Sequence, residues 1–163
     1  MTPTPPAAPM IEIEIEEAAW TEALPDAAAL ARGAALAAGG LGGGGSIAIL
    51  LTDDEAVRQL SARFRARDVA TNVLSFPAAA NVEGHLGDIA LAFGVCAREA
   101  AEQDKALADH LRHLVIHGVL HLLGYDHQAE DPARRMEAIE RDLLAALGVA
   151  DPYAEGDPVQ QRR

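Results

Sequence analysis

The sequence has a single cysteine, Cys96, among its 163 residues. One cysteine forms no internal disulfide, and a metal site built from cysteines alone is equally excluded. We expect a small buried thiol at this position, because free cysteine is among the most frequently buried residue types. The absence of a disulfide framework is typical of a cytoplasmic protein.

Basic and aromatic residues are also scarce. The chain has 13 lysines and arginines against 25 aspartates and glutamates, a net charge of −12. This balance argues against a protein that coats polyanions generally, because such proteins carry a basic surface. It leaves room for a local basic groove. Aromatic residues make up 4% of the chain, so sequence-specific reading of bases by stacking is not expected.

No long apolar segment is uninterrupted, although half of the residues are hydrophobic. The apolar stretch at residues 27–51 is broken by Arg32 and by a run of glycines, whereas a membrane-spanning helix needs about 20 continuous apolar residues. Residues 1–10 are rich in proline and have no basic residue before an apolar stretch, so no signal peptide is visible. We therefore expect a cytoplasmic protein that does not contact a membrane.

Strand and helix patterns alternate along the rest of the chain. Residues 11–16 alternate isoleucine and glutamate, which predicts a half-buried strand with isoleucine inward. A capping box between Thr52 and Glu55 is expected to begin one of the helices. Further strands are expected at 46–52, 71–76 and 87–93, and helices at 25–38, 52–65, 95–102, 105–123 and 131–147.

This order predicts an α/β fold of the α+β type, with one layer of four-stranded mixed sheet packed with about five helices. The last two strands are expected to be antiparallel neighbours, because the short loop between them has no helical pattern. The length fits one domain. We place it at residues 11–150, between a disordered proline-rich arm at 1–10 and a loose tail at 151–163.

Five of the six histidines fall between residues 110 and 127. His117 and His121 are one i, i+4 step apart on an expected helix, so both imidazoles can reach one metal ion. Gly124 ends that helix, and His127 follows where it can fold back as a third ligand. Three protein ligands leave one position for water, as in catalytic zinc sites. The sequence thus predicts one zinc ion per chain on these three histidines.

The remaining helix histidines, His110 and His113, are expected to be ordinary members of an apolar helix. His113 lies one turn before His117 and could support the site from behind. In the common metalloprotease pattern His-Glu-x-x-His, the glutamate is the general base. Gly118 stands at that position here, which weakens a peptidase interpretation.

Residues 58–67 contain no acidic residue and four arginines, Arg58, Arg63, Arg65 and Arg67. Guanidinium groups bind phosphate in a bidentate manner and stay charged at any working pH. This local reversal of charge indicates a phosphate-containing ligand. The alternative for Arg58, Arg63 and Arg67 is a solvated helix face.

Three motifs together resemble the bacterial YbeY endoribonucleases, which are metal-dependent enzymes of ribosomal RNA maturation. They are Phe64-Arg65-x-x-Asp68-x-x-Thr71-Asn72-Val73-Leu74-Ser75-Phe76-Pro77, the strand Gly87-Asp88-Ile89, and the segment from His117 to His127. The resemblance spans residues 11–147 in consistent order. The family's usual Lys-Pro before the threonine is replaced by Val69-Ala70.

The resemblance implies zinc on His117, His121 and His127, and a catalytic role for Arg65 in stabilising charge on phosphate oxygens. It implies action on ribosomal RNA, in small-subunit maturation and ribosome quality control. The implied partners are the ribosome or small-subunit proteins, and DNA is not expected as a substrate. Single-stranded RNA is the expected substrate, because its backbone can bend into a compact site. The attacking group stays open between a metal-activated water and the RNA's own 2′-hydroxyl, and no general base is identified.

Two other functions stay open. One is a zinc hydrolase of peptides or small molecules, and the other is a ribosome-assembly factor whose zinc is structural. A structural zinc would need a fourth ligand. The candidates nearest in sequence are Asp88, Asp126 and His113.

Overall fold

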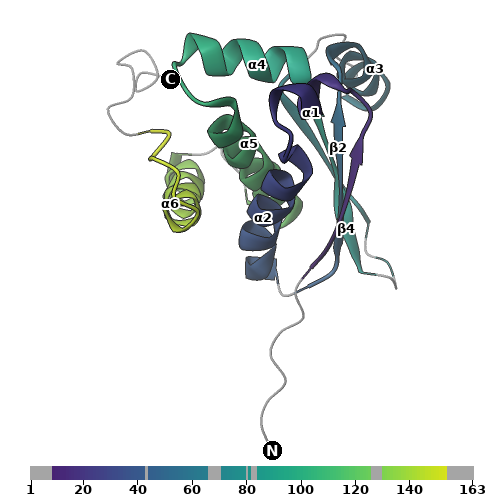
Figure 1. The fold of residues 1–163 in the computed structure, drawn as a ribbon. Helices are drawn as coiled ribbons and strands as arrows, with labels where there is room; N and C mark the ends of the chain where they lie inside the picture. Colours follow the sequence, from purple (N-terminus) through teal and green to yellow (C-terminus); the bar gives the residue numbers. More distant parts are fainter. Residues whose placement is uncertain are drawn as a thin grey trace, which may run out of the picture.

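The computed structural model describes residues 9–42, 44–65, 71–79, 81, 84–125 and 130–153. Figure 1 shows their arrangement as a sheet with helices packed mainly on one side. The described elements are β1 (Met10–Ile15), α1 (Ala19–Ala23), α2 (Ala27–Gly39), the 3-10 helix η1 (Gly40–Gly42), β2 (Ser46–Thr52), α3 (Asp54–Arg65), β3 (Val73–Pro77), β4 (His85–Ala92), α4 (Phe93–Glu102), α5 (Leu107–Leu122) and α6 (Glu130–Ala146).

The four strands form one mixed sheet in the order β1-β2-β4-β3. β2 pairs in parallel with both β1 and β4, while β3 and β4 are antiparallel neighbours. The predicted α+β fold and its antiparallel pair are thereby confirmed. The sequence analysis missed α1, a five-residue helix, which carries the fully buried Trp20.

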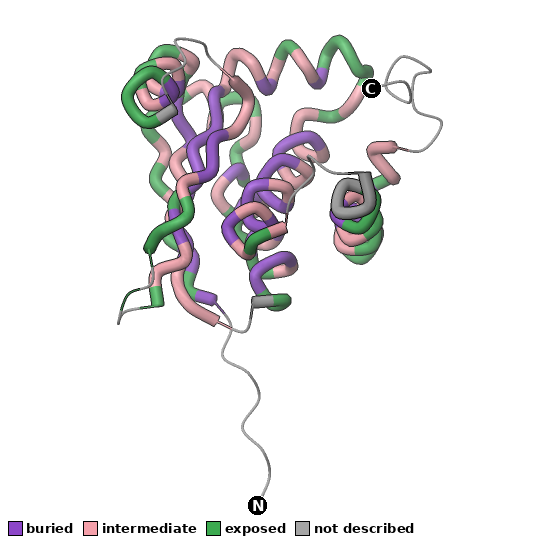
Figure 2. Tube along the Cα trace, turned by 180° about the vertical axis from the view of Figure 1, so that it is seen from behind, coloured by how far each residue is buried: buried purple, intermediate pink, exposed green. Residues whose placement is uncertain are grey.

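One face of the sheet forms the main core. Ile11, Ile13 and Ile15 of β1 pack into this core, while Glu12 and Glu14 between them are exposed, so the predicted alternation is confirmed. Helices α2 and α5 cover this face and α6 lies beyond them (Figure 1). Figure 2 shows the buried residues concentrated on the strands and on α2 and α5. Helix α5 is therefore held between the sheet and α6.

The ends of two helices test the predicted stop and start signals. Gly124 has a φ of 98°, and the amide of Tyr125 donates to the carbonyl of Leu120 at 3.0 Å, which confirms the glycine stop after α5. The predicted capping box is wrong. The Asp53 carboxylate accepts from the amide of Ala56 at 2.7 Å, whereas the Thr52 hydroxyl is bonded to Glu16.

The predicted domain limits need two small corrections. Met10 already belongs to β1, where its amide donates to the carbonyl of Gly45 at 2.7 Å. Residues 151–153, predicted to begin a loose tail, fold against α6 through Asp151 and Tyr153. The rest of the predicted arm and tail lies outside the described residues. Among the helices of the described part, none is long and apolar enough to cross a membrane.

Candidate metal centre

Helix α5 carries four histidines at spacings of three and four residues: His110, His113, His117 and His121. These spacings place them in one stripe along the helix. The ring centroids of successive pairs lie 6.5, 6.4 and 4.6 Å apart. His117 and His121 are thus the closest pair, at the end of the helix before Gly124.

The Nε2 atoms of His117 and His121 lie 3.1 Å apart. Two nitrogens that each lie about 2.0–2.1 Å from a tetrahedral zinc ion are separated by about 3.3 Å. The two imidazoles therefore fit shared binding of one ion without a change of the helix. The predicted third ligand, His127, and the candidate Asp126 lie outside the described residues.

The other ring nitrogen of His117 is held by a carboxylate from α6. His117 Nδ1 donates to Glu140 Oε2 at 2.9 Å, and the Glu140 side chain is 1% exposed. A carboxylate only accepts hydrogen bonds, so this contact places a proton on Nδ1, and in the neutral imidazole the lone pair is then on Nε2. Histidines that bind metals commonly donate their second N–H to such a carboxylate.

Glu140 also accepts from a residue beyond α6. The Tyr153 hydroxyl donates to Glu140 Oε1 at 2.5 Å. His113 Nε2 lies 3.2 Å from the Tyr153 oxygen and 3.4 Å from Glu140 Oε2. His113 therefore stands behind His117, as the sequence suggested, and not beside the His117–His121 pair as a ligand.

The electrostatics of this group keep Glu140 ionised. Burial by itself would raise the pKa of Glu140, but hydrogen bonds from His113 and His117 outweigh it and lower the pKa to about 2. Burial, together with the charge of Glu140, raises the pKa of Tyr153 above its usual range. At neutral pH the Glu140 carboxylate therefore stays an acceptor and the Tyr153 phenol stays a donor.

Gly118 stands at the position of the protease-type glutamate and packs closely against the sheet. An added Cβ at this position would lie 3.1 Å from side-chain carbons of Ile89 and 3.1 Å from Ser75 Oγ. The Ser75 hydroxyl donates to the carbonyl of Gly118 at 3.1 Å. Position 118 is thus a close contact between α5 and the sheet, where a larger side chain would have to displace Ile89 and Ser75.

Residues of the Thr71–Pro77 motif contact the helices next to β3. Asn72 donates to Glu99 Oε1 at 2.9 Å, and His110 Nε2 donates to the same oxygen at 2.9 Å. Burial works to raise the pKa of Glu99, but the hydrogen bonds from His110 and Asn72 prevail and lower it. Phe76 packs edge-on against Phe64 of α3, with ring centroids 5.6 Å apart. The motif thus connects β3 to α3, α4 and α5.

The arginines predicted for phosphate binding lie on α3. Arg65 is its last residue, and the Arg65 side chain and all of Arg67 lie outside the described part of the chain. Arg58 is bonded to Glu55, with Nε 2.8 Å from Oε2. Arg63 lies over the ring of Phe64, 5.9 Å from its centroid. Arg58 and Arg63 therefore have local partners on the helix surface.

The candidate fourth ligand Asp88 lies on the face of the sheet opposite α5. Its carboxylate is bonded to His85 Nε2 at 3.0 Å, and His85 Nδ1 is bonded to Ser46 at 2.8 Å. Within the described residues, no group of three or more histidine, cysteine or carboxylate side chains could hold a metal ion. A third ligand for the His117–His121 pair would therefore come from outside the described residues, where the predicted His127 lies.

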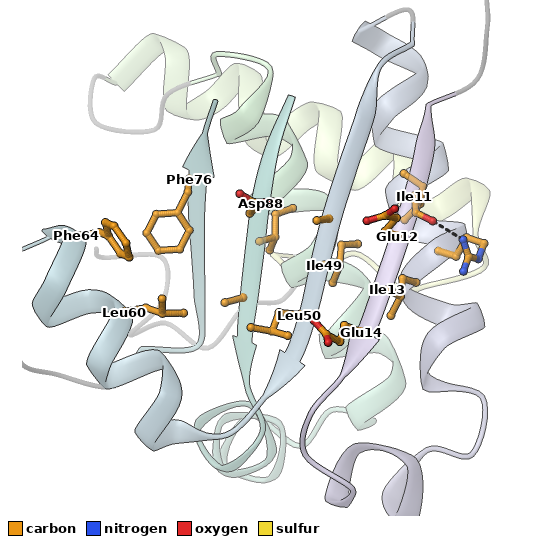
Figure 3. A pocket seen from close by; sticks show the side chains of 14 residues that line it. Ile11, Glu12, Ile13, Glu14, Ile49, Leu50, Leu60, Phe64, Phe76 and Asp88 are labelled. Carbon is orange, nitrogen blue, oxygen red and sulfur yellow. Dashed lines mark hydrogen bonds between the residues drawn. The ribbon is translucent and has the colours of Figure 1, made fainter. Parts of the chain in front are cut away.

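Asp88 belongs instead to a groove of about 930 Å³ on the opposite face of the sheet. Figure 3 shows this groove, with Phe64 and Leu60 of α3 at one side and Glu12 and Glu14 of β1 at the other. Its charged side chains include three carboxylates, so it does not suit a phosphate backbone. No described histidine lines it.

Sequence reasoning missed Glu140 and Tyr153. Tyr153 carries no local signal, since it lies 40 residues from His113. Glu140 does carry one. Met136, Glu140 and Leu144 are spaced by four residues and are all buried, so the glutamate stands within the apolar stripe of α6. A lone acid at a core position needs a partner.

Comparisons with known proteins identify the family of the chain. The family model described as Endoribonuclease YbeY matches residues 11–148. A relative with that name from Maricaulis maris is 63% identical over 114 residues, covering 70% of this chain and 71% of its own. Another from Paramagnetospirillum magneticum is 49% identical over 157 residues, covering 89% of this chain and 96% of its own. The solution structure of TM1509 from Thermotoga maritima has a similar fold, with a TM-score of 0.56 at 22% identity, covering 91% of this chain and 97% of that one.

Proposed function

The chain belongs to the YbeY endoribonuclease family, and from this premise we propose that it is a zinc-dependent endoribonuclease. It cleaves phosphodiester bonds of single-stranded RNA in the cytoplasm, in the maturation of small-subunit ribosomal RNA and in ribosome quality control. The observation that carries this proposal is the 3.1 Å convergence of His117 and His121, with His117 held from behind by the buried Glu140.

In this proposal His117, His121 and His127 hold one zinc ion per chain. A zinc ion bound there would supply Lewis-acid chemistry to a phosphoryl group. The side chains do the positioning: Glu140 orients His117, and the glycine turn after α5 carries the chain toward His127. Arg65 donates N–H groups to the non-bridging phosphate oxygens, where negative charge develops.

Charge and shape favour single-stranded RNA bound mainly through phosphates. The chain is strongly acidic, and the large groove on the far side of the sheet carries Glu12, Glu14 and Asp88. A rigid duplex would meet repulsion from much of this surface, whereas a flexible strand needs only a local contact. The ribosome or small-subunit proteins are the partners that we propose to bring this RNA to the site.

Two features speak against the alternative functions. Gly118 occupies the position of the general base in the His-Glu-x-x-His pattern, and the close packing there opposes a larger side chain. A closed structural zinc site would need a fourth ligand, but Asp88 is engaged by His85, and His113 is turned to Tyr153. The contacts of Asp88 and His113 favour a site that keeps a position for substrate, and the third candidate, Asp126, lies outside the described residues.

One assay tests the proposal. Zinc-loaded, chelated, His121→Ala and Arg65→Ala proteins are incubated with single-stranded RNA, and folding is followed by circular dichroism. His85→Ala is the control for loss of a histidine outside the stripe, and Arg63→Ala is the control for loss of an α3 arginine. We expect cleavage only by the loaded wild type and the two controls. Cleavage that survives chelation would refute the metal mechanism.

Two further outcomes separate the alternatives. Equal cleavage by the Arg65→Ala and wild-type proteins would remove the arginine from the mechanism. If the zinc-loaded protein does not cleave RNA and chelation unfolds it, a structural zinc would be favoured.

A further inference from the structure

A connected group of polar side chains continues from the histidine pair into the protein. Glu140 Oε2 accepts from His117 Nδ1 at 2.9 Å, and Glu140 Oε1 accepts from the Tyr153 hydroxyl at 2.5 Å. The Tyr153 oxygen lies 3.2 Å from His113 Nε2. Because Glu140 is almost fully buried, its oxygens depend on these side chains and not on solvent.

The direction of each hydrogen bond follows from the available protons. A carboxylate only accepts, so the single hydroxyl proton of Tyr153 goes to Glu140, and the hydroxyl oxygen accepts from His113. His117 then carries its proton on Nδ1. In the neutral ring its Nε2 then has the lone pair, 3.1 Å from Nε2 of His121.

We propose that Glu140 is a positioning residue that fixes the tautomer and ring orientation of His117, and that Tyr153 fixes Glu140. This assignment rests on the proposed function, because it places both residues behind the same metal site. A carboxylate that accepts the second N–H of a metal-binding histidine makes the ligating nitrogen more basic and holds the ring in place. Glu140 thus prepares His117 before an ion arrives.

The place of Tyr153 depends on a turn after α6. Asp151 accepts from the Tyr153 amide at 2.8 Å and pairs with Arg141 Nε at 3.1 Å. The Arg141 guanidinium lies over the Tyr153 ring, 5.2 Å from its centroid. The segment after α6 therefore brings the phenol to Glu140, so residues remote in sequence from the histidines contribute to the site.

The first test reads the tautomer of His117 in metal-free protein by nitrogen NMR of the labelled rings. The wild type should show a protonated Nδ1 and a lone pair on Nε2. Glu140→Ala should give a mixture that includes the Nε2–H form. Glu99→Ala, which removes the carboxylate from His110 of the same helix, should leave the His117 signals unchanged. An unchanged His117 tautomer in Glu140→Ala would overturn the assignment.

The second test measures zinc affinity by competition with a chelator, together with the free energy of unfolding. We expect affinity to fall about 10-fold in Glu140→Gln and up to about 100-fold in Glu140→Ala. Tyr153→Phe, which acts through Glu140, should cost about 3-fold, and Glu99→Gln less than about 2-fold. Lower stability with unchanged affinity in both Glu140 variants would reduce Glu140 to a structural role and overturn the assignment.

RNA cleavage is measured separately, so the two proposals can fail independently. A wild type that does not cleave RNA refutes the proposed function, while the metal-free tautomer still decides the role of Glu140. A wild type that binds zinc and cleaves RNA, with no effect of Glu140 on tautomer or affinity, refutes only the positioning role.

Discussion

Helix α5 carries two histidines that each bind a carboxylate on another helix, and the two pairs use different ring nitrogens. His117 meets Glu140 of α6, and His110 meets Glu99 of α4, each at 2.9 Å. Each carboxylate has a second donor, Tyr153 on Glu140 and Asn72 on Glu99. The pairs differ in which ring nitrogen faces the carboxylate, Nδ1 in His117 and Nε2 in His110.

The outer nitrogen decides what each pair does. In His117 it is Nε2, turned toward His121 on a side chain that is 25% exposed. In His110 it is Nδ1, which is buried and has no hydrogen-bond partner among the described residues. In the proposed function, the same contact prepares a ligand at one end of the helix, whereas at the other end it stabilises the core.

The largest expected effect comes from His121→Ala. This variant removes the imidazole that faces His117 Nε2, so that the outer nitrogen of neither pair faces a second histidine on this side. In His121→Ala we expect RNA cleavage to fall at least about 1,000-fold, roughly 4 kcal/mol. Zinc per chain, measured by atomic absorption, should fall in parallel. His110→Ala should keep its zinc and lose thermal stability, because Glu99 loses a donor. Full zinc occupancy in His121→Ala would contradict the difference between the pairs.

Acid should distinguish the two carboxylates by how much each contributes to the free energy of unfolding. The folded pKa of Glu140 is about 2, below an ordinary 4.5, so its stabilisation is complete above pH 4.5 and is lost as the pH falls toward 2. The loss is on the order of 3 kcal/mol. Glu99 shifts in the same direction but is 30% exposed, so it should contribute less.

The measurement is urea unfolding of metal-free protein between pH 5 and 2.5. Glu140→Gln should flatten the decline of the unfolding free energy more than Glu99→Gln does. Equal slopes for the two variants would show that burial makes no difference between the pairs.

Local sequence patterns predicted those features that depend on neighbouring residues. The alternation in residues 11–15 and the glycine stop at Gly124 belong to this class, as does the i, i+4 placement of His117 and His121. The third ligand, His127, and the role of Arg65 stay predictions. Neither has a described side chain against which to test it.

The features that sequence missed depend on contacts across the fold. Thr52 has the residue type of a helix cap, but its hydroxyl is taken by Glu16, 36 positions away. The short helix α1 is stabilised through Trp20, whose indole N–H donates to the carbonyl of Thr52 at 3.0 Å. Glu140 reaches a histidine 23 positions earlier in the sequence. Local periodicity does not encode such partners.

A smaller effect is expected from removing the carboxylate of the bracing pair. Glu99→Ala leaves the buried Nε2–H of His110 and the amide of Asn72 without their acceptor, which should cost about 1–3 kcal/mol of unfolding free energy. Zinc affinity should change by less than about 2-fold, because the His117 contact with Glu140 is intact. Denaturant unfolding and chelator competition on one preparation give both values. A loss of affinity comparable to that in Glu140→Ala would abolish the distinction between the pairs.

The smallest effect should come from Asn72→Ala, which removes the second donor to Glu99. The bond measures 2.9 Å, but Glu99 is partly exposed and water can replace the amide, so we expect a cost of about 1 kcal/mol. The His117 tautomer and zinc affinity should not change. A change in either would show that the pairs communicate along α5, through His113, which lies between them with ring centroids 6.5 and 6.4 Å from those of its neighbours. The Thr71–Pro77 motif would then influence the proposed metal site as well as the packing of the helices around β3.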